Sequence, residues 1–262
     1  AIHLAENDRP GPVWLDIPLD IQSGEIDERK IKKFLSIINY SKIKKISDNT
    51  FTKITNLIKK SLKPTIVVGN GIHTSSAEKN LNNLLKRVSL PVLSSWNGSD
   101  LFNFNNKKYI GRFGLFGDRA SNFAIQNSDL IIVFGSRLSQ PQIGYNISRF
   151  SVDAKIIYID IDVKEIQKFG KKVVYKFVCD LNFFLFNYCL FLKKRKLKIS
   201  NKNWLSQCLK WKYKYPVVLK KYKKEKKINY FYFIETLSKC LTKNSIIVTD
   251  MGTSFTCTMQ TF

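Results

Sequence analysis

Two short apolar runs stand out in the middle of the chain. Leu130 to Phe134 and Ile156 to Ile161 are each long enough for one strand, and their apolar residues follow one another without alternation. Such runs are typical of parallel strands covered on both faces. Gly135-Ser136-Arg137 follows the first run, and Asp160 and Asp162 lie at the end of the second. Ligands of open α/β sheets bind at the carboxyl ends of strands, so the pattern predicts a nucleotide cradle there.

Further apolar patterns extend this arrangement toward the N-terminus. Apolar residues at helical spacing predict a helix from Thr50 to Leu62, and short apolar runs predict strands at Thr65 to Val68 and Pro91 to Ser94. Ser75 and Glu78 have the spacing of a capping box that opens the next helix. The predicted fold class is α/β, with a central doubly wound parallel sheet of the Rossmann-like, nucleotide-binding type.

Glycines follow several of these predicted strands. Gly69-Asn70-Gly71 separates a strand from a helix, which is either an anion-binding turn with free amides or a plain tight turn. Gly114 and Gly117 precede Asp118, which is expected to cap a helix. The carboxylates of Asp160 and Asp162 could accept hydrogen bonds from ribose or ribityl hydroxyls. Asp162 could equally well only cap the helix that follows it.

The two ends of the chain each contain one isolated strand pattern. Val13 to Ile17 is bracketed by prolines, and Ser245 to Thr249 follows a predicted helix from Tyr230 to Leu241. A single strand cannot form a domain, so we expect the chain to be a fragment. Lys193 to Lys227 is a basic linker whose Trp204 to Trp211 strip is expected to pack as a helix on its own domains, although stacking on single-stranded nucleic acid is the alternative.

Composition adds two constraints. The net charge is +24, with 44 Lys and Arg against 20 Asp and Glu. A polyanion partner or simple compositional drift toward lysine explains this excess, and the absence of a base-reading module favours drift. Five widely spaced cysteines without a CxxC pair indicate reduced thiols and a cytoplasmic setting. No apolar run reaches the length of a membrane span, so we expect no membrane partner. Because no base-reading module is visible, we expect no nucleic acid partner either.

Several stretches resemble thiamine diphosphate enzymes similar to acetolactate synthase. Arg9 to Gln22, RPGPVWLDIPLDIQ, resembles the end of that family's pyrimidine-binding domain, although Asp8 replaces a usual glycine. Ile159 to Lys168, IDIDVKEIQK, resembles a central-domain element, and Gly135 to Ser139 resembles another, with Ser139 in place of a usual aspartate. Asp250-Met251-Gly252-Thr253-Ser254 resembles the opening turn of the diphosphate-binding domain.

This resemblance implies a division into five parts. Residues 1–22 would end a pyrimidine-binding domain, 23–49 form a linker, and 50–192 form the whole central domain. Residues 193–227 would form the basic linker, and 228–262 begin a truncated diphosphate-binding domain. The family's catalytic glutamate would lie upstream and its magnesium motif downstream, so we expect no catalytic or metal-binding residue in the chain and no activity from it alone.

The resemblance also implies the site residues. An FAD-type cofactor of the central domain would contact Arg9, Gly71, Asn97, Gly114, Leu115, Phe116, Gly117, Gly135, Ser136, Arg137, Asp160, Ile161 and Asp180. Thiamine diphosphate would contact Gly252, Thr253 and Ser254.

The expected function is that of an acetolactate synthase-like carboligase or lyase acting on 2-oxo acids. The implied cofactors are thiamine diphosphate and Mg²⁺, with FAD where the central domain holds a nucleotide. The implied assembly is a homodimer or homotetramer. Departures at Ser139, Thr253 and Ser254 keep open a thiamine diphosphate-dependent lyase of sugar or cell-surface saccharide biosynthesis. A non-catalytic nucleotide-binding module is the alternative from another class.

Overall fold

The computed structural model describes residues 1–7, 9–32, 45–242 and 244–262. A six-stranded parallel sheet lies at the centre, in the order β4-β3-β1-β5-β6-β7. Its strands are β1 (Pro64–Val68), β3 (Val92–Ser94), β4 (Tyr109–Arg112), β5 (Leu130–Phe134), β6 (Lys155–Asp160) and β7 (Val173–Val178). Numbered within the sheet, this is the doubly wound order 3-2-1-4-5-6, with the switch point between β1 and β5. The predicted α/β fold class is confirmed.

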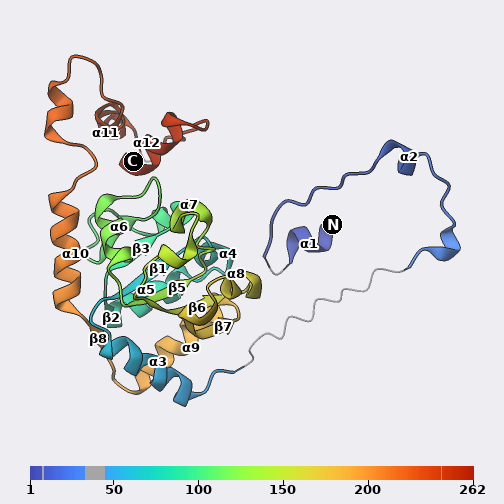
Figure 1. Ribbon diagram of the computed structural model, residues 1–262, viewed down its shortest axis with the longest axis horizontal. Helices are drawn as coiled ribbons and strands as arrows, with labels where there is room; N and C mark the ends of the chain where they lie inside the picture. The colour runs from blue at the N-terminus through green and yellow to red at the C-terminus, as the bar shows by residue number, and fades with distance from the viewer. Residues whose placement is uncertain (8, 33–44, 243) are drawn as a thin grey trace.

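Helices cover both faces of this sheet (Figure 1). The longer helices of the chain are α3 (Asp48–Lys60), α5 (Glu78–Arg87), α6 (Arg119–Gln126), α9 (Leu181–Lys194), α10 (Lys202–Lys214), α11 (Tyr230–Cys240) and α12 (Thr253–Thr261). Short helices are α1 (Ile2–Glu6), α2 (Leu19–Gln22), α4 (Gly71–Thr74), α7 (Gln140–Ile143) and α8 (Val163–Gln167). The 3₁₀ turns are η1 (Glu28–Lys30), η2 (Trp96–Leu101), η3 (Ile147–Arg149), η4 (Gly170–Lys172) and η5 (Lys220–Lys224). A separate two-stranded sheet pairs β2 (Val88–Ser89) with β8 (Ile199–Ser200).

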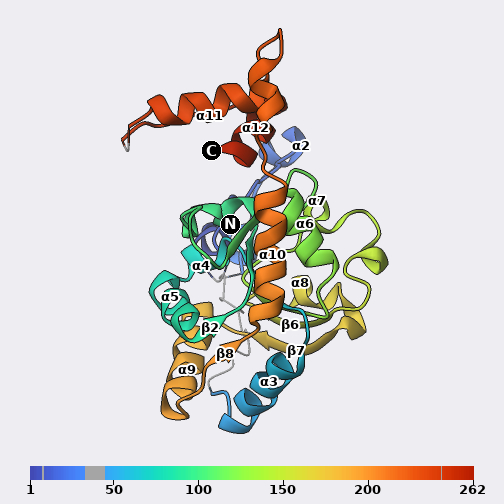
Figure 2. The ribbon, with the colours of Figure 1, turned by 90° about the vertical axis from the view of Figure 1, so that its left-hand side faces the viewer.

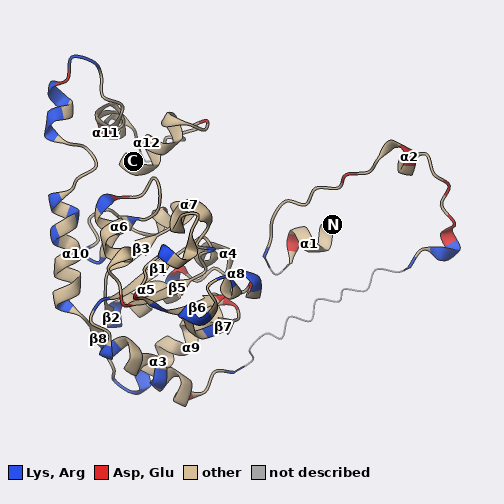
Figure 3. Cartoon of the chain, viewed as in Figure 1, with Lys and Arg blue, Asp and Glu red and all other residues tan. Residues whose placement is uncertain are grey.

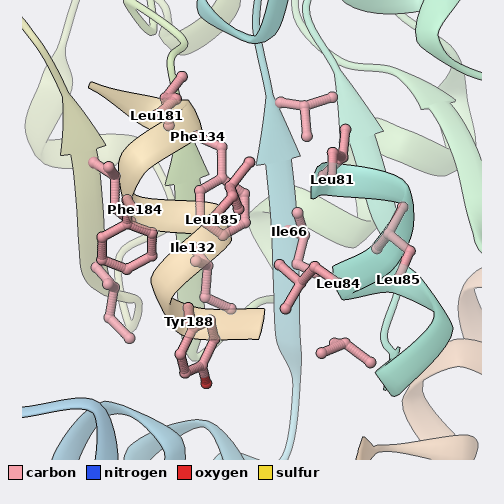
Figure 4. Close-up of a cluster of buried hydrophobic side chains, with 14 of the residues drawn as sticks. Ile66, Leu81, Leu84, Leu85, Ile132, Phe134, Leu181, Phe184, Leu185 and Tyr188 are labelled. Carbon is pink, nitrogen blue, oxygen red and sulfur yellow. The ribbon is translucent and has the colours of Figure 1, made fainter. Parts of the chain in front are cut away.

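Each face of the sheet has its own apolar core. On one face, side chains of α3, α5 and α9 pack onto the strands, as Figure 4 shows for Leu84, Phe184 and Ile66. On the other face, α6, α8 and α10 supply the core, with Trp204 and Cys208 buried. Figure 2 shows α10 running beside α6, which it contacts. The strip from Trp204 to Trp211 therefore packs on its own domain, as the amphipathic pattern predicted.

Both isolated strand predictions are wrong. Val13 to Ile17 and Ser245 to Thr249 have no strand structure, and their apolar side chains are largely exposed. A strand needs a neighbour to accept its backbone hydrogen bonds, and neither segment has one within the described residues. Asp8 and residues 33–44 of the predicted connector lie outside the described residues, and the predicted domain boundaries stay predictions.

Two predicted caps are also wrong. The chain forms the extra helix α4 before α5, so Ser75 ends α4 by donating to Gly71 O at 2.7 Å, and α5 begins at Glu78 without a side-chain cap. Asp118 does precede α6, but its carboxylate accepts the Arg112 amide at 2.6 Å instead of capping the helix.

Candidate functional site

A cavity of about 350 Å³ opens at the carboxyl ends of β1, β3, β5 and β6, where the strand order reverses. In doubly wound sheets this switch point is the usual place for a ligand. Its lining residues are Arg9, Pro10, Asn70, Gly71, Thr74, Ser95, Trp96, Asn97, Gly135, Ser136, Arg137, Ser139, Pro141, Gln142, Asp160 and Ile161. Eight of these are predicted site residues: Arg9, Gly71, Asn97, Gly135, Ser136, Arg137, Asp160 and Ile161.

The glycine loops after β1 and β5 meet behind this cavity. A Cβ on Gly69 would lie 2.5 Å from Ser136 Cα, and one on Gly71 would lie 2.7 Å from Gly135 Cα. Gly135 also has a φ of +57°, which glycine adopts without strain. These glycines are therefore required because two backbones cross closely, and this crossing fixes the floor of the cavity.

Several amides of the turn after β1 are already used inside the protein. Gly71 N donates to Gly135 O at 2.9 Å, Ile72 N to Gly69 O at 3.2 Å, and His73 N to Asn70 O at 2.9 Å. These three bonds form a tight turn, whereas the amide of Asn70, which lines the cavity, has no acceptor among the described residues, so the anion-binding hypothesis stays a prediction. Positive charge at the cavity comes from side chains.

Two arginines supply that charge, and one carboxylate holds both. Glu165 Oε1 accepts Arg137 Nε at 2.7 Å and Arg9 Nη1 at 3.3 Å, while Lys168 Nζ reaches Oε2 at 2.7 Å. Arg9 also pairs with Asp162 at 3.2 Å. Burial favours the neutral form of Glu165, but hydrogen bonds from Lys168 and Arg137 outweigh it and lower its pKa. Arg9 lies 153 residues from Asp162 and 156 residues from Glu165 along the chain, so these ion pairs tie the N-terminal segment to α8.

The two aspartates after β6 differ in role. Asp162 caps α8 by accepting the Lys164 amide at 2.9 Å, as one of its two interpretations predicted. Asp160 is buried at the cavity wall and accepts the Asp162 amide at 2.9 Å. Burial raises the pKa of Asp160. Asp160 is thus a buried carboxylate at the wall of the cavity.

Comparison with known families agrees with this geometry. A family model described as the thiamine pyrophosphate enzyme, central domain, matches residues 51–186, which include all six strands of the main sheet. The chain belongs to the thiamine pyrophosphate enzymes.

Relatives among these enzymes carry acetolactate synthase names. The probable acetolactate synthase large subunit of Methanocaldococcus jannaschii is 35% identical over 170 residues, 64% of this chain and 29% of that protein. Acetolactate synthase 2, chloroplastic, of Nicotiana tabacum is 31% identical over 255 residues, 96% of this chain and 38% of that protein. The acetolactate synthase large subunit of Buchnera aphidicola is 30% identical over 254 residues, 96% of this chain and 44% of that protein. The chain spans less than half the length of each.

The predicted residues after β4 of this thiamine pyrophosphate enzyme lie beside the cavity without lining it. Gly114 is fixed by Asn122, which bonds both its N and its O. Phe116 packs against Trp96, a lining residue, with 5.7 Å between ring centroids, whereas Leu115 is exposed. Gly117 accepts a bond from Gln260 of α12. This segment supports the cavity wall from behind.

Asp180 lies outside the cavity lining. Its carboxylate caps α9 by accepting the Phe183 amide at 2.8 Å. The structure therefore gives Asp180 a local structural bond.

The described residues do not by themselves fit thiamine diphosphate. A Cβ on Gly252 would meet nothing within 4 Å, so the turn before α12 forms no cradle. Thr253 is exposed, and Ser254 Oγ donates to Asp250 O at 2.9 Å. Within the described ranges, no group of three His, Cys, Asp or Glu side chains could hold a metal ion.

The sequence patterns missed three features of the site. Trp96 lines the cavity beside the predicted Asn97, and its indole nitrogen is buried without a hydrogen-bond partner among the described residues. Glu165 was not singled out, although the IDIDVKEIQK element contains it. His73 links α4 to its neighbours, with Nδ1 2.9 Å from Glu78 and Nε2 3.1 Å from Asp100.

Burial opposes the charged ring of His73, but the carboxylates of Asp100 and Glu78 outweigh it and raise its pKa.

Of the helices in the described ranges, none is long and apolar enough to cross a membrane.

Proposed function

We propose that this chain is part of a thiamine diphosphate-dependent carboligase similar to acetolactate synthase, which acts on 2-oxo acids. The observation that carries the proposal is the continuous similarity of 96% of the chain to acetolactate synthases of tobacco and Buchnera. That similarity includes the segments on either side of the central domain, so it extends beyond the shared nucleotide-type fold. When bound, thiamine diphosphate supplies an electron sink for the carbanion formed next to a carbonyl. We further propose that the full-length protein assembles as a homodimer or homotetramer.

We also propose that the cavity at the switch point binds FAD. Its position, its two arginines and its buried carboxylate support this proposal. Arg9 and Arg137 each use one nitrogen on Glu165, and a guanidinium has further N–H groups for phosphate oxygens. Asp160 is placed to accept a ribose or ribityl hydroxyl, as acidic residues do in dinucleotide folds.

Titration of FAD into the purified chain tests this proposal. We expect Arg137→Ala to weaken uptake about tenfold, equal to about 1.4 kcal/mol, because one charge-assisted pair is lost. The matched control is Arg149→Ala, since Arg149 is exposed and does not line the cavity. Equal affinity of the two variants, or no uptake by the unchanged chain, would end the FAD proposal.

A separate measurement tests the expected distribution of the active site. The chain alone is expected to give no thiamine-dependent turnover of pyruvate, because the described residues form neither a thiamine cradle nor a metal cluster. Turnover by the chain alone would contradict the expected distribution of the active site.

A further inference from the structure

The outer face of α9 is apolar and uncovered. The helix, LNFFLFNYCLFLKK, is apolar on nearly all sides, yet only one side packs on the sheet. On the other side, Phe186 is 51% exposed and Leu190 is 47% exposed, four residues apart on one face. A helix that is apolar all round is normally covered all round. Within the described residues, nothing covers this face.

Two depressions flank this exposed face. One, of about 640 Å³, lies between α9 and the start of α3, and the other, of about 490 Å³, lies between α9 and α5. Both are lined by Leu190 and Lys193, so they adjoin along the helix. We call the two depressions the α9 groove. Its apolar lining residues are Ile46, Phe51, Phe183, Phe186, Leu190 and Phe191.

The rim of the α9 groove is strongly basic. Its charged lining residues are Lys45, Asp48, Lys86, Arg87, Lys193, Lys194 and Lys198. The single acid among them, Asp48, already pairs with Arg195 at 3.7 Å. Lys and Arg also recur on the ribbon around α3 (Figure 3). The groove therefore combines an apolar floor with an excess of positive charge.

We propose that the α9 groove binds an acidic amphipathic helix of a partner protein. Such a helix places apolar residues at i, i+3, i+4 and i+7 into a groove and leaves its charges at the rim. Acidic residues there complement the lysines and speed the encounter. A second copy of this chain is a poor occupant, because a two-fold contact would bring the same cations together. This inference does not depend on the proposed enzyme activity.

A synthetic peptide of about five helical turns provides the probe. It carries Leu at positions i, i+3 and i+4 of each seven-residue repeat and Glu elsewhere, and binding is followed by fluorescence anisotropy. A twin with Lys in place of Glu and a scrambled peptide of equal composition serve as peptide controls. We expect the acidic amphipathic peptide to bind at least about tenfold more tightly than either.

Because the whole chain carries a net charge of +24, position-matched variants are decisive. Leu190→Glu and Lys193→Glu should each weaken binding about tenfold or more. Val152→Glu and Lys220→Glu add the same charges at exposed positions outside the groove and should weaken it much less. Thermal melting confirms that each variant is folded.

Three results would overturn the proposal. One is equal weakening by the groove and control variants, which indicates non-specific charge. Another is self-association in sedimentation that Leu190→Glu abolishes, which assigns the face to a second copy. The third is binding of phosphatidylserine vesicles through Leu190 without binding of the peptide, which assigns it to a lipid surface.

Discussion

Replacing Gly135 by alanine tests whether the crossing of the two glycine loops sets the cavity floor. An added Cβ would overlap Leu181 and lie 2.7 Å from Gly71 Cα, which is backbone and cannot rotate away. Gly135 also has a φ of +57°. Gly170 is a matched control, because its φ is +51° and a Cβ there would meet nothing within 4 Å.

The two substitutions share one cost and differ in the other. The left-handed conformation costs an ordinary residue roughly 1–2 kcal/mol, and this applies to both glycines. Overpacking adds roughly 1–3 kcal/mol at Gly135 only. We therefore expect Gly170→Ala to lower the free energy of unfolding by about 1–2 kcal/mol and Gly135→Ala by about 2–5 kcal/mol.

Urea unfolding followed by circular dichroism measures both losses, provided that the slope against urea concentration is unchanged. Equal losses for the two variants would show that the loops separate at no cost. The account of the cavity floor would then be refuted.

Three other perturbations give distinct outcomes. Thr55→Val should cost about 1–3 kcal/mol in thermal melts, because it leaves the buried Tyr188 hydroxyl, 2.9 Å away, without its partner, and adding Tyr188→Phe should recover part of the loss. Burial lowers the pKa of Lys212 from 10.5 to about 8. Between pH 8 and 10.5 the unfolded state therefore binds more protons than the folded state, so the free energy of unfolding should rise with pH. Lys212→Met should flatten that rise when urea unfolding is measured across this pH range. Because the pKa of His73 in the folded protein is raised above 6.5, its contribution to stability is complete below pH 6.5 and is lost as pH rises through the folded pKa. His73→Gln should therefore lower the free energy of unfolding most at acid pH. NMR titration of the imidazole ring should give the raised pKa.

Four strands of the main sheet, β1, β3, β5 and β6, were predictable from the sequence because they are buried on both faces. The sequence patterns missed β4 and β7, and β7 is an edge strand that is only partly buried. Burial forces a continuous apolar run, and β5 has the bounds that its run predicted. The same reasoning failed for Val13 to Ile17 and Ser245 to Thr249, which are also apolar. An apolar run records a tendency to be buried, whereas a strand also requires a neighbour that local sequence does not specify.

The location of the cavity was more predictable than the hydrogen-bond partners of the side chains around it. Parallel strands bring their carboxyl ends to one edge, so residues after β1, β5 and β6 had to gather there. Hydrogen-bond partners depend on details of packing that spacing does not encode. Asp118 illustrates this, because it lies at the expected helix start yet bonds the Arg112 amide. Glu165 lies on the same element as the predicted Asp160, but only the structure places both arginines on its carboxylate.

That arrangement determines how an anionic ligand would gain affinity at the cavity. Several amides after β1 bond within the protein, and the charged donors at the cavity are Arg9 and Arg137, which Glu165 already engages. Exposed ion pairs contribute about 0–1 kcal/mol, and these arginines are 43% and 63% exposed. A bidentate bond between a guanidinium and a phosphate is stronger than such a pair, so exchange of partners favours the ligand. A diphosphate, which can engage both arginines at once, gains twice from the exchange. A monophosphate engages one arginine and leaves Glu165 with the other.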